Sequence, residues 1–138
     1  MRSTTSAGEG PGVYVYRTHL DLSRFDPATV RISGSWASDN AGLAIRVNGV
    51  PTGLVNDVGN TFAVLVPFVI DATNAPGLVA GVNTIDFVVQ NAGGGFTGLR
   101  VDGRAAVGKL LTNSPPEFAG FAAGTPFGNR PSAPSVSA

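Results

Sequence analysis

The chain has 138 residues, 43% of them hydrophobic, which is enough for one domain with a sizeable core. Nine basic residues balance nine acidic ones, and charged residues make up only 13% of the chain, so neither a nucleic-acid partner nor an anionic membrane surface is expected. The chain contains no cysteine, which excludes disulfides, thiolate nucleophiles and cysteine-bound zinc.

The first twelve residues, MRSTTSAGEGPG, contain no apolar run of the kind that a secretory signal needs. No apolar stretch approaches the roughly 20 residues of a membrane span. Together with the Met start, this favours a complete gene product that its own N-terminus does not export. We predict residues 1–12 to be an N-terminal extension.

Period-two alternation of apolar and polar residues dominates from Val13 to about Val107 and predicts an all-β domain. In VYVYRTHLDL the first strand is expected to have a charged outer face with Arg17, His19 and Asp21. Its opposite face is expected to point into the core, with Tyr14, Tyr16, Thr18, Leu20 and Leu22.

The next two strands surround the only tryptophan. In TVRISGSW the inward face is predicted to hold Val30, Ile32, Gly34 and Trp36. The following strand is predicted to direct Leu43, Ile45 and Val47 inward. Asn48-Gly49 predicts a type I′ hairpin, with a short partner strand from Val50 to Leu54, because both turn residues accept a positive φ.

The segment TFAVLVPFVI is apolar on both faces of the strand that it predicts. One face is expected to carry Phe62, Val64, Val66, Phe68 and Ile70. Leu65 and Val69 make the opposite face apolar, and Pro67, which lacks a backbone donor, indicates an edge or bulge position. A partner is therefore expected to cover the second face.

Two further strands complete the pattern, with inward residues Ile85, Phe87, Val89, Leu99 and Val101. Six to eight short strands separated by Gly, Asn and Pro turns predict a two-sheet antiparallel β-sandwich, in particular a jelly roll, over residues 13–108.

The character of the chain changes after residue 108. Residues 109–138 carry five of the ten prolines and show no alternation, which predicts an extended C-terminal arm. The arm is studded with apolar side chains that a plain flexible tail would not need, and we predict that they bind partner subunits. They are Leu110, Leu111, Phe118, Phe121 and Phe127.

Four segments follow one another in a recognisable order: YRTHLDL, FDPATVRISGSWASDNAGLAIRVNGV, VAGVNTIDFVVQNAGG and TGLRVDG. This order, over about Val13 to Val107, resembles the galactose-binding-like jelly-roll modules of bacterial extracellular and sorting-anchored proteins. The resemblance implies the fold. Some members of such families bind sugars or calcium through loops at one end of the sandwich, whereas others mediate contacts, so it does not decide the ligand. We expect this chain to depart from the secreted pattern, with no leader, no sorting tail and no neighbouring catalytic domain.

The loops offer a candidate ligand site with two interpretations. As a sugar site, Trp36 would stack on a pyranose ring while Asp39, Asn40 and Asn91 bond its hydroxyls, with Phe96 as an exposed platform. Strand parity favours the other interpretation, in which Trp36 enters the core and Asp39-Asn40 shape a turn.

Candidates for metal binding and catalysis are sparse. Calcium would need six to eight oxygen ligands, and the loops supply scattered ones rather than a dense D-x-D-x-D run. These are Asp39, Asn40, Asp57, Asn60 and Asp71. The sole histidine, His19, lies on a charged strand face with no Ser-His-Asp arrangement, so we predict a protein without enzymatic activity and without a cofactor.

Two classes of function follow. The first is a structural assembly protein, such as a decoration or cement protein on the surface of a phage virion, bound to a capsid or other lattice protein and to its own copies as a trimer. The second is a carbohydrate-binding or adhesion module at a bacterial cell surface. The Met start without a leader, the low surface charge and the apolar arm favour the first class.

Overall fold

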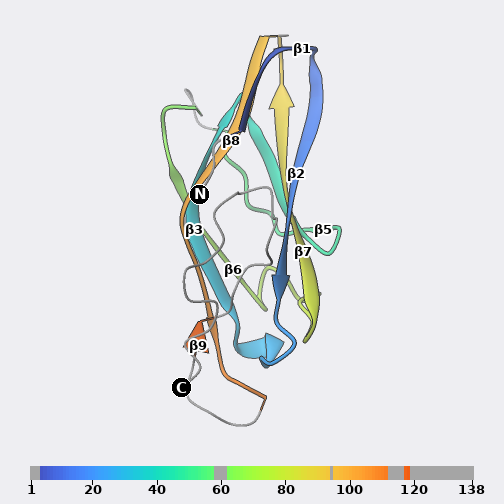
Figure 1. Cartoon of the computed structure of the whole chain (residues 1–138), viewed down its shortest axis with the longest axis vertical. Coiled ribbons are helices and arrows are strands. Elements are labelled where there is room, and N and C mark those ends of the chain that lie inside the picture. Colours follow the sequence, from blue (N-terminus) through green and yellow to red (C-terminus); the bar gives the residue numbers. More distant parts are fainter. Residues whose placement is uncertain (1–3, 58–61, 94, 112–116, 119–138) are drawn as a thin grey trace.

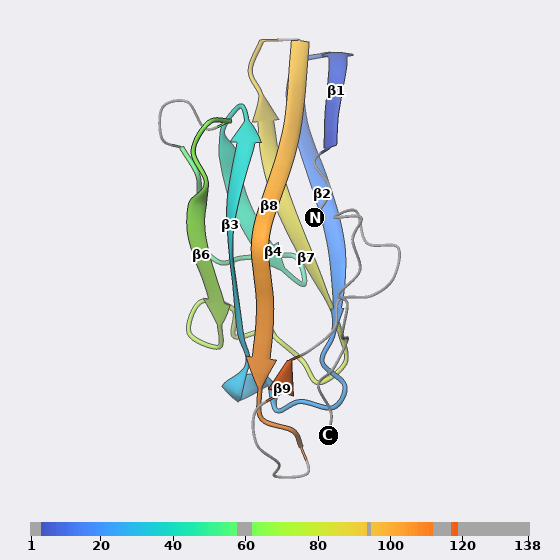
Figure 2. The same ribbon diagram turned by 60° about the vertical axis from the view of Figure 1, so that its left-hand side comes forward.

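The computed structural model describes residues 4–57, 62–93, 95–111 and 117–118. Strands form two antiparallel sheets packed face to face (Figure 1, Figure 2), so the prediction of an all-β, two-sheet sandwich is confirmed. The elements are β1 (Thr4–Glu9), β2 (Gly12–Asp21), the 3-10 turn η1 (Pro27–Thr29), β3 (Arg31–Asp39), β4 (Gly42–Val47), β5 (Val50–Pro51), β6 (Val66–Asp71), β7 (Val82–Asn91), β8 (Gly95–Gly108) and β9 (Glu117–Phe118). None of the described residues belongs to a helix long and apolar enough to cross a membrane.

The strand order is that of a jelly roll. One sheet has the order β1-β8-β3-β6, with β9 pairing with the end of β8, and the other has the order β2-β7-β4-β5. The antiparallel pairs β4–β5, β3–β6, β2–β7 and β1–β8 are therefore nested, as in one long hairpin folded across two sheets. Among the strands that the structure describes, this nesting leaves four in outer positions: β1, β6, β2 and β5.

Alternation along the strands places the core as predicted. In β2 the side chains of Thr18 and Leu20 are buried, whereas Arg17 and His19 are exposed. The same period buries the predicted inward residues of the later strands. These are Ile32, Trp36, Ile45, Val47, Phe68, Ile70, Ile85, Phe87, Val89, Leu99 and Val101.

The predicted hairpin after β4 is confirmed. Asn48 and Gly49 have φ angles of 51° and 84°, as a type I′ turn requires. The turn brings Val50 opposite Val47 and begins β5. The returning segment stays beside β4 beyond this strand, because the Ile45 N–H donates to the carbonyl of Leu54 at 3.2 Å.

The prediction for Leu43 is wrong. The pairing of β4 with β7 shifts register between Gly42 and Ala44, and Leu43 is 40% exposed instead of facing inward with Ile45. Such a bulge adds a residue to one strand, so the alternation before the bulge no longer predicts the face.

The strand predicted over residues 62–70 is shorter than expected. β6 begins at Val66, where its pairing with β3 ends opposite Trp36, so Phe62 and Val64 lie outside the ladder. They are 66% and 44% exposed, and the prediction that they face inward is wrong. The edge position that Pro67 indicated is confirmed, since β6 is an outer strand.

The segment predicted as an N-terminal extension supplies β1. It pairs with the first part of β8, from Gly95 to Leu99, and this pairing contains a register shift between Ser6 and Glu9. The five-stranded sheet therefore includes residues upstream of Val13.

Candidate functional site

Trp36 belongs to the core and is not a ligand platform. Its side chain is fully buried and meets Phe87 edge to face, with ring centroids 5.4 Å apart. A Cβ atom at Gly42 would lie only 2.4 Å from the Trp36 ring, so glycine is needed there for the ring to fit. Strand parity therefore gave the right interpretation of this residue.

The Asp39-Asn40 pair shapes the connection between β3 and β4, as the turn interpretation predicts. The Asn40 side chain donates to the Asp39 carboxylate at 3.1 Å and accepts from the Ala92 N–H at 2.8 Å. Hydroxyls hold the backbone of the pair: Ser38 donates to the Asn40 carbonyl and Thr97 to the Asp39 carbonyl, both at 2.7 Å. These polar groups therefore stabilise the loop itself.

Asn91 and Phe96 lie near the same end of the sandwich and differ in exposure. Asn91 is buried and donates to the carbonyl of Gly10 at 3.1 Å, so it ties β7 to the turn between β1 and β2. Phe96, near the start of β8, is 66% exposed. Of these two predicted ligand residues, only Phe96 presents its side chain to solvent.

A shallow hollow of about 190 Å³ lies where β3 and β8 run side by side. Ala37 and Asp39 lie at odd spacing from the inward Trp36, and Arg100 is exposed between the inward Leu99 and Val101. Alternation therefore places all three on the outer face of the sheet, although Ala37 is itself buried. Phe62 stands at the hollow from the segment before β6. The lining residues are Ala37, Ser38, Asp39, Phe62, Thr97, Gly98, Leu99 and Arg100.

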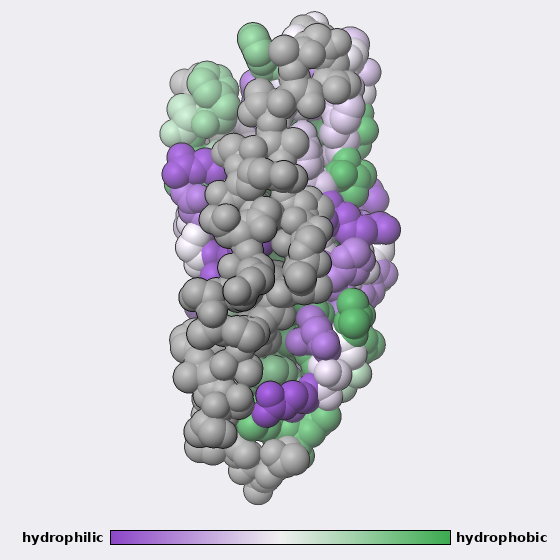
Figure 3. All heavy atoms as spheres, viewed as in Figure 1, coloured by the Kyte–Doolittle hydropathy of each residue, from purple (hydrophilic) through white to green (hydrophobic). Residues whose placement is uncertain are grey.

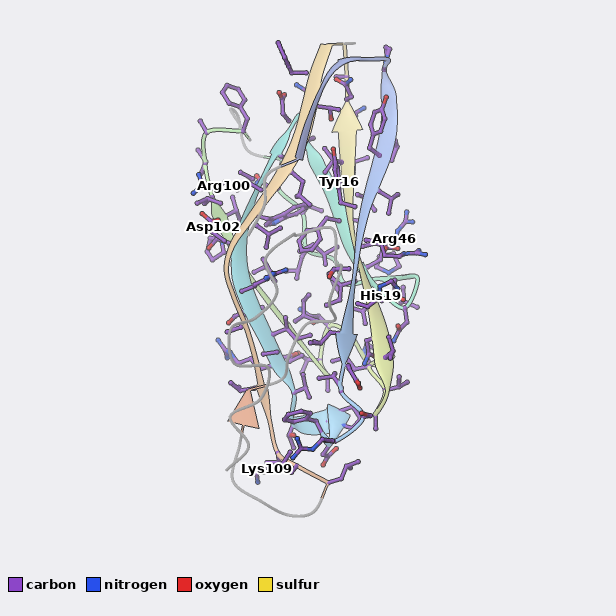
Figure 4. The ribbon with its side chains drawn as sticks, viewed as in Figure 1. Tyr16, His19, Arg46, Arg100, Asp102 and Lys109 are labelled. Atoms are coloured by element: carbon purple, nitrogen blue, oxygen red, sulfur yellow. The ribbon has the colours of Figure 1, made fainter. Side chains whose placement is uncertain are left out.

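The hollow combines an aromatic ring with charge. Arg100 pairs with Asp102, two residues along β8, with 2.5 Å between the guanidinium and carboxylate atoms. Both side chains are partly exposed, so water screens the pair strongly. Figure 4 shows the two residues together on one side of the molecule, with His19 and Arg46 on the other.

The hollow unites one predicted ligand residue, Asp39, with two that the sequence prediction missed. Arg100 was detectable, because alternation in GLRVDG directs it outward beside the inward Leu99 and Val101. Phe62 was not, since its place depends on where the β3–β6 ladder ends.

The start of the predicted arm belongs to the domain. Leu110 is 8% exposed, lies in the core cluster and bridges to Phe25, so its partner is its own sandwich, unlike the prediction of a contact to another subunit. Leu111 is 58% exposed, with its N–H bonded to the Arg24 carbonyl at 2.9 Å. Phe118, in β9, pairs through its backbone with Val107 of β8. Phe121 and Phe127 lie outside the described residues.

The candidate metal ligands are not brought together. Within the described part of the chain, no three His, Cys, Asp or Glu side chains form a group that could hold a metal ion. Asp71 instead accepts hydrogen bonds from the Thr73 hydroxyl and N–H, which lower the pKa of this carboxyl and fix the turn after β6. Asn60 lies outside the described residues.

Several large apolar side chains are exposed on the described surface, and two groups of them are close together in the sequence. One group, Phe62, Val64 and Leu65, precedes β6, and Figure 3 shows hydrophobic spheres beside the start of this strand. The other group, Val13 and Val15, belongs to the outer face of β2, where they are 58% and 50% exposed.

These surfaces, together with the hollow, are the features that a function has to use. Comparison of the chain with models of protein families, with curated proteins and with solved structures finds no match in any of the three.

Proposed function

We propose that this chain is a non-catalytic assembly protein, whose jelly roll docks on other protein surfaces and on copies of itself. The observation that carries the proposal is the exposure of large apolar side chains on a surface of low charge. Val13, Val15 and Phe62 are each at least half exposed, and Leu111 presents a further apolar side chain at the end of the domain. Full burial of such a side chain from water is worth about 1.5–3 kcal/mol, so each of these half-exposed side chains contributes roughly half of that on docking.

A decoration or cement protein on a phage capsid is the setting that we propose for this activity. Such a protein needs a rigid body that seats on a lattice and a segment that reaches its neighbours. The jelly roll provides the first. The residues that follow Leu111 provide the second, with Phe121 and Phe127 as anchors in a trimer.

The position of Leu110 in the core decides how the arm is tested. Deleting residues 109–138 would remove Leu110 from the core, so only side chains beyond Leu110 are changed. The arm variant replaces Leu111, Phe121 and Phe127 by Ser. We expect the arm variant to unfold at the temperature of the unmodified chain but to lose the trimer, as measured by light scattering after size exclusion. A trimer that survives in the arm variant would contradict this role of the arm.

The hollow favours a second candidate function, that of a carbohydrate-binding or adhesion module at a cell surface. Phe62 offers an apolar face, while Asp39 and Arg100 offer an acceptor and donors beside it. About 190 Å³ is less than the roughly 300 Å³ of a small-molecule pocket, and suits one ring of a longer glycan.

Replacement of the aromatic ring tests this candidate. For any glycan that the unmodified chain binds on a glycan array, we expect Phe62→Ala to weaken binding about tenfold, the equivalent of a lost aromatic contact. Phe96→Ala is the matched control, because its ring is equally exposed but does not line the hollow. Equal losses in both variants, or no glycan bound by the unmodified chain, would exclude the hollow as a sugar site.

A further inference from the structure

The four outer strands differ in how well they are protected against pairing with another strand. Proteins commonly disable such edges by short strands, prolines or bulges. β5 has two residues, one of them Pro51, β6 contains Pro67, and β1 has the register shift between Ser6 and Glu9. β2 has none of these three devices, since its ten residues pair with β7 in unbroken register and include no proline, and only the charges of Arg17 and Asp21 guard its edge.

The register identifies which backbone groups of β2 face the edge with which no described strand pairs. The Leu22 N–H donates to the Gly81 carbonyl at 2.7 Å and continues the register in which Asp21 faces Val82. Even-numbered residues of β2 therefore bond to β7, and the N–H and C=O groups of odd-numbered residues point outward along the edge. These are Val13, Val15, Arg17, His19 and Asp21.

The side chains on this edge carry fixed charges of opposite sign. Arg17 is held by Asp86 of β7 through two bonds, of 2.7 Å from Nε and 2.9 Å from Nη2. Hydrogen bonds from the side chain and the backbone N–H of Ser23 lower the pKa of Asp21, so its carboxylate is charged at neutral pH. His19 stands between the two and projects from the side of the molecule in Figure 4.

We propose that β2 pairs antiparallel with β2 of a second copy of this chain, about a two-fold axis at His19. In this register Arg17 of each copy lies opposite Asp21 of the other, so the contact contains two pairs of opposite charges related by the two-fold axis. An axis at Arg17 would instead set two guanidinium groups against each other. The pairing joins two four-stranded sheets into one continuous sheet.

The inference deepens the proposed assembly function by naming a second contact. A three-fold contact through the arm and a two-fold contact through β2 would together extend an array. The two contacts use different residues. The arm variant is therefore expected to remain a dimer if the β2 contact forms.

Two substitutions at the edge, made in the full chain and in the arm variant, test the pairing. Asp21→Lys places a cation opposite Arg17, and His19→Pro removes the central outward N–H while leaving the bonds to β7 in place. Asp57→Lys is the matched control, with the same change of charge at an exposed residue of the loop after β5. Thermal unfolding verifies that each variant folds, and sedimentation velocity gives the dissociation constant.

We expect the arm variant to be a dimer, whose dissociation constant rises at least about tenfold with Asp21→Lys and with His19→Pro but not with Asp57→Lys. Two results would overturn the inference. One is an arm variant that stays monomeric, because another part of the chain or another protein then covers β2. The other is a dimer that both edge substitutions leave unchanged. A trimer that persists in the arm variant would contradict the proposed role of the arm, and the two edge substitutions would still test the β2 contact.

Discussion

Replacement of Trp36 by alanine is expected to lower the free energy of unfolding by about 3–5 kcal/mol, the cost of removing a large aromatic side chain from a packed core. The ring is fully buried between the two sheets and contacts Phe87 edge to face. Gly42 lies against the ring and is the backbone segment nearest to the space that the substitution would leave. It cannot shift far into this space, because its N–H and C=O both bond to the backbone of Asn56 at 2.8 Å. The cavity is therefore expected to stay largely open.

Urea denaturation followed by far-UV circular dichroism measures this loss, and Phe96→Ala is the control. Phe96 is two-thirds exposed, so its removal should change the free energy of unfolding by no more than about 0.5 kcal/mol. If Trp36→Ala unfolded like the unmodified chain while a bound ligand was lost, the ring would be a ligand platform and its place in the core would be refuted.

Alternation predicted much of this fold because it reports directly on which face of a strand is buried. Trp36 follows Ile32 at even spacing, and Phe87 follows Ile85, so their faces could be assigned without knowledge of the partner strands. The Asn48-Gly49 turn was equally local, since its two positive φ angles depend only on those two residues.

The errors arose where a long-range pairing ends or slips. The predicted inward face of Leu43 is wrong because the register of β4 shifts against β7. That of Phe62 is wrong because the pairing of β6 with β3 stops at Val66. Leu110 follows a change in composition that suggested an arm, yet its side chain completes the core beside Phe25. None of these three features changes the apolar–polar alternation of the local sequence, so alternation could not predict them.

The candidate site was harder to predict than the core for the same reason. The hollow forms only because Ala37 of β3 stands opposite Arg100 of β8, which is a matter of register between segments about sixty residues apart. The outer position of β2 in the described sheet likewise follows from the nesting of the strand pairs. Composition and alternation indicated the jelly roll, but they did not indicate which outer strand would lack protection.

Asn83 is a buried polar residue that holds two loops together at the other end of the sandwich. Alternation in VNTIDFVVQ directs it inward with Ile85, where an amide is costly unless all its groups are bonded. Its carbonyl oxygen accepts from the Asn48 side chain and from the Val79 N–H, both at 2.9 Å. Its amide group donates to the carbonyls of Val79 and Gly81, at 2.9 and 3.0 Å. The residue therefore joins the β4–β5 hairpin to the loop before β7.

Asn83→Ala is expected to destabilise the domain by about 2–4 kcal/mol, because each buried partner that loses its bond costs about 1–3 kcal/mol and water recovers part of the loss. Asn83→Asp should be at least as damaging, since a carboxylate would face the carbonyls of Val79 and Gly81 in place of a donor. Gln90→Ala, which removes an exposed amide from the same strand, is the control in urea denaturation. A loss below about 0.5 kcal/mol for Asn83→Ala would mean that water replaces the hydrogen bonds of Asn83 to both loops and that this side chain does not determine their position.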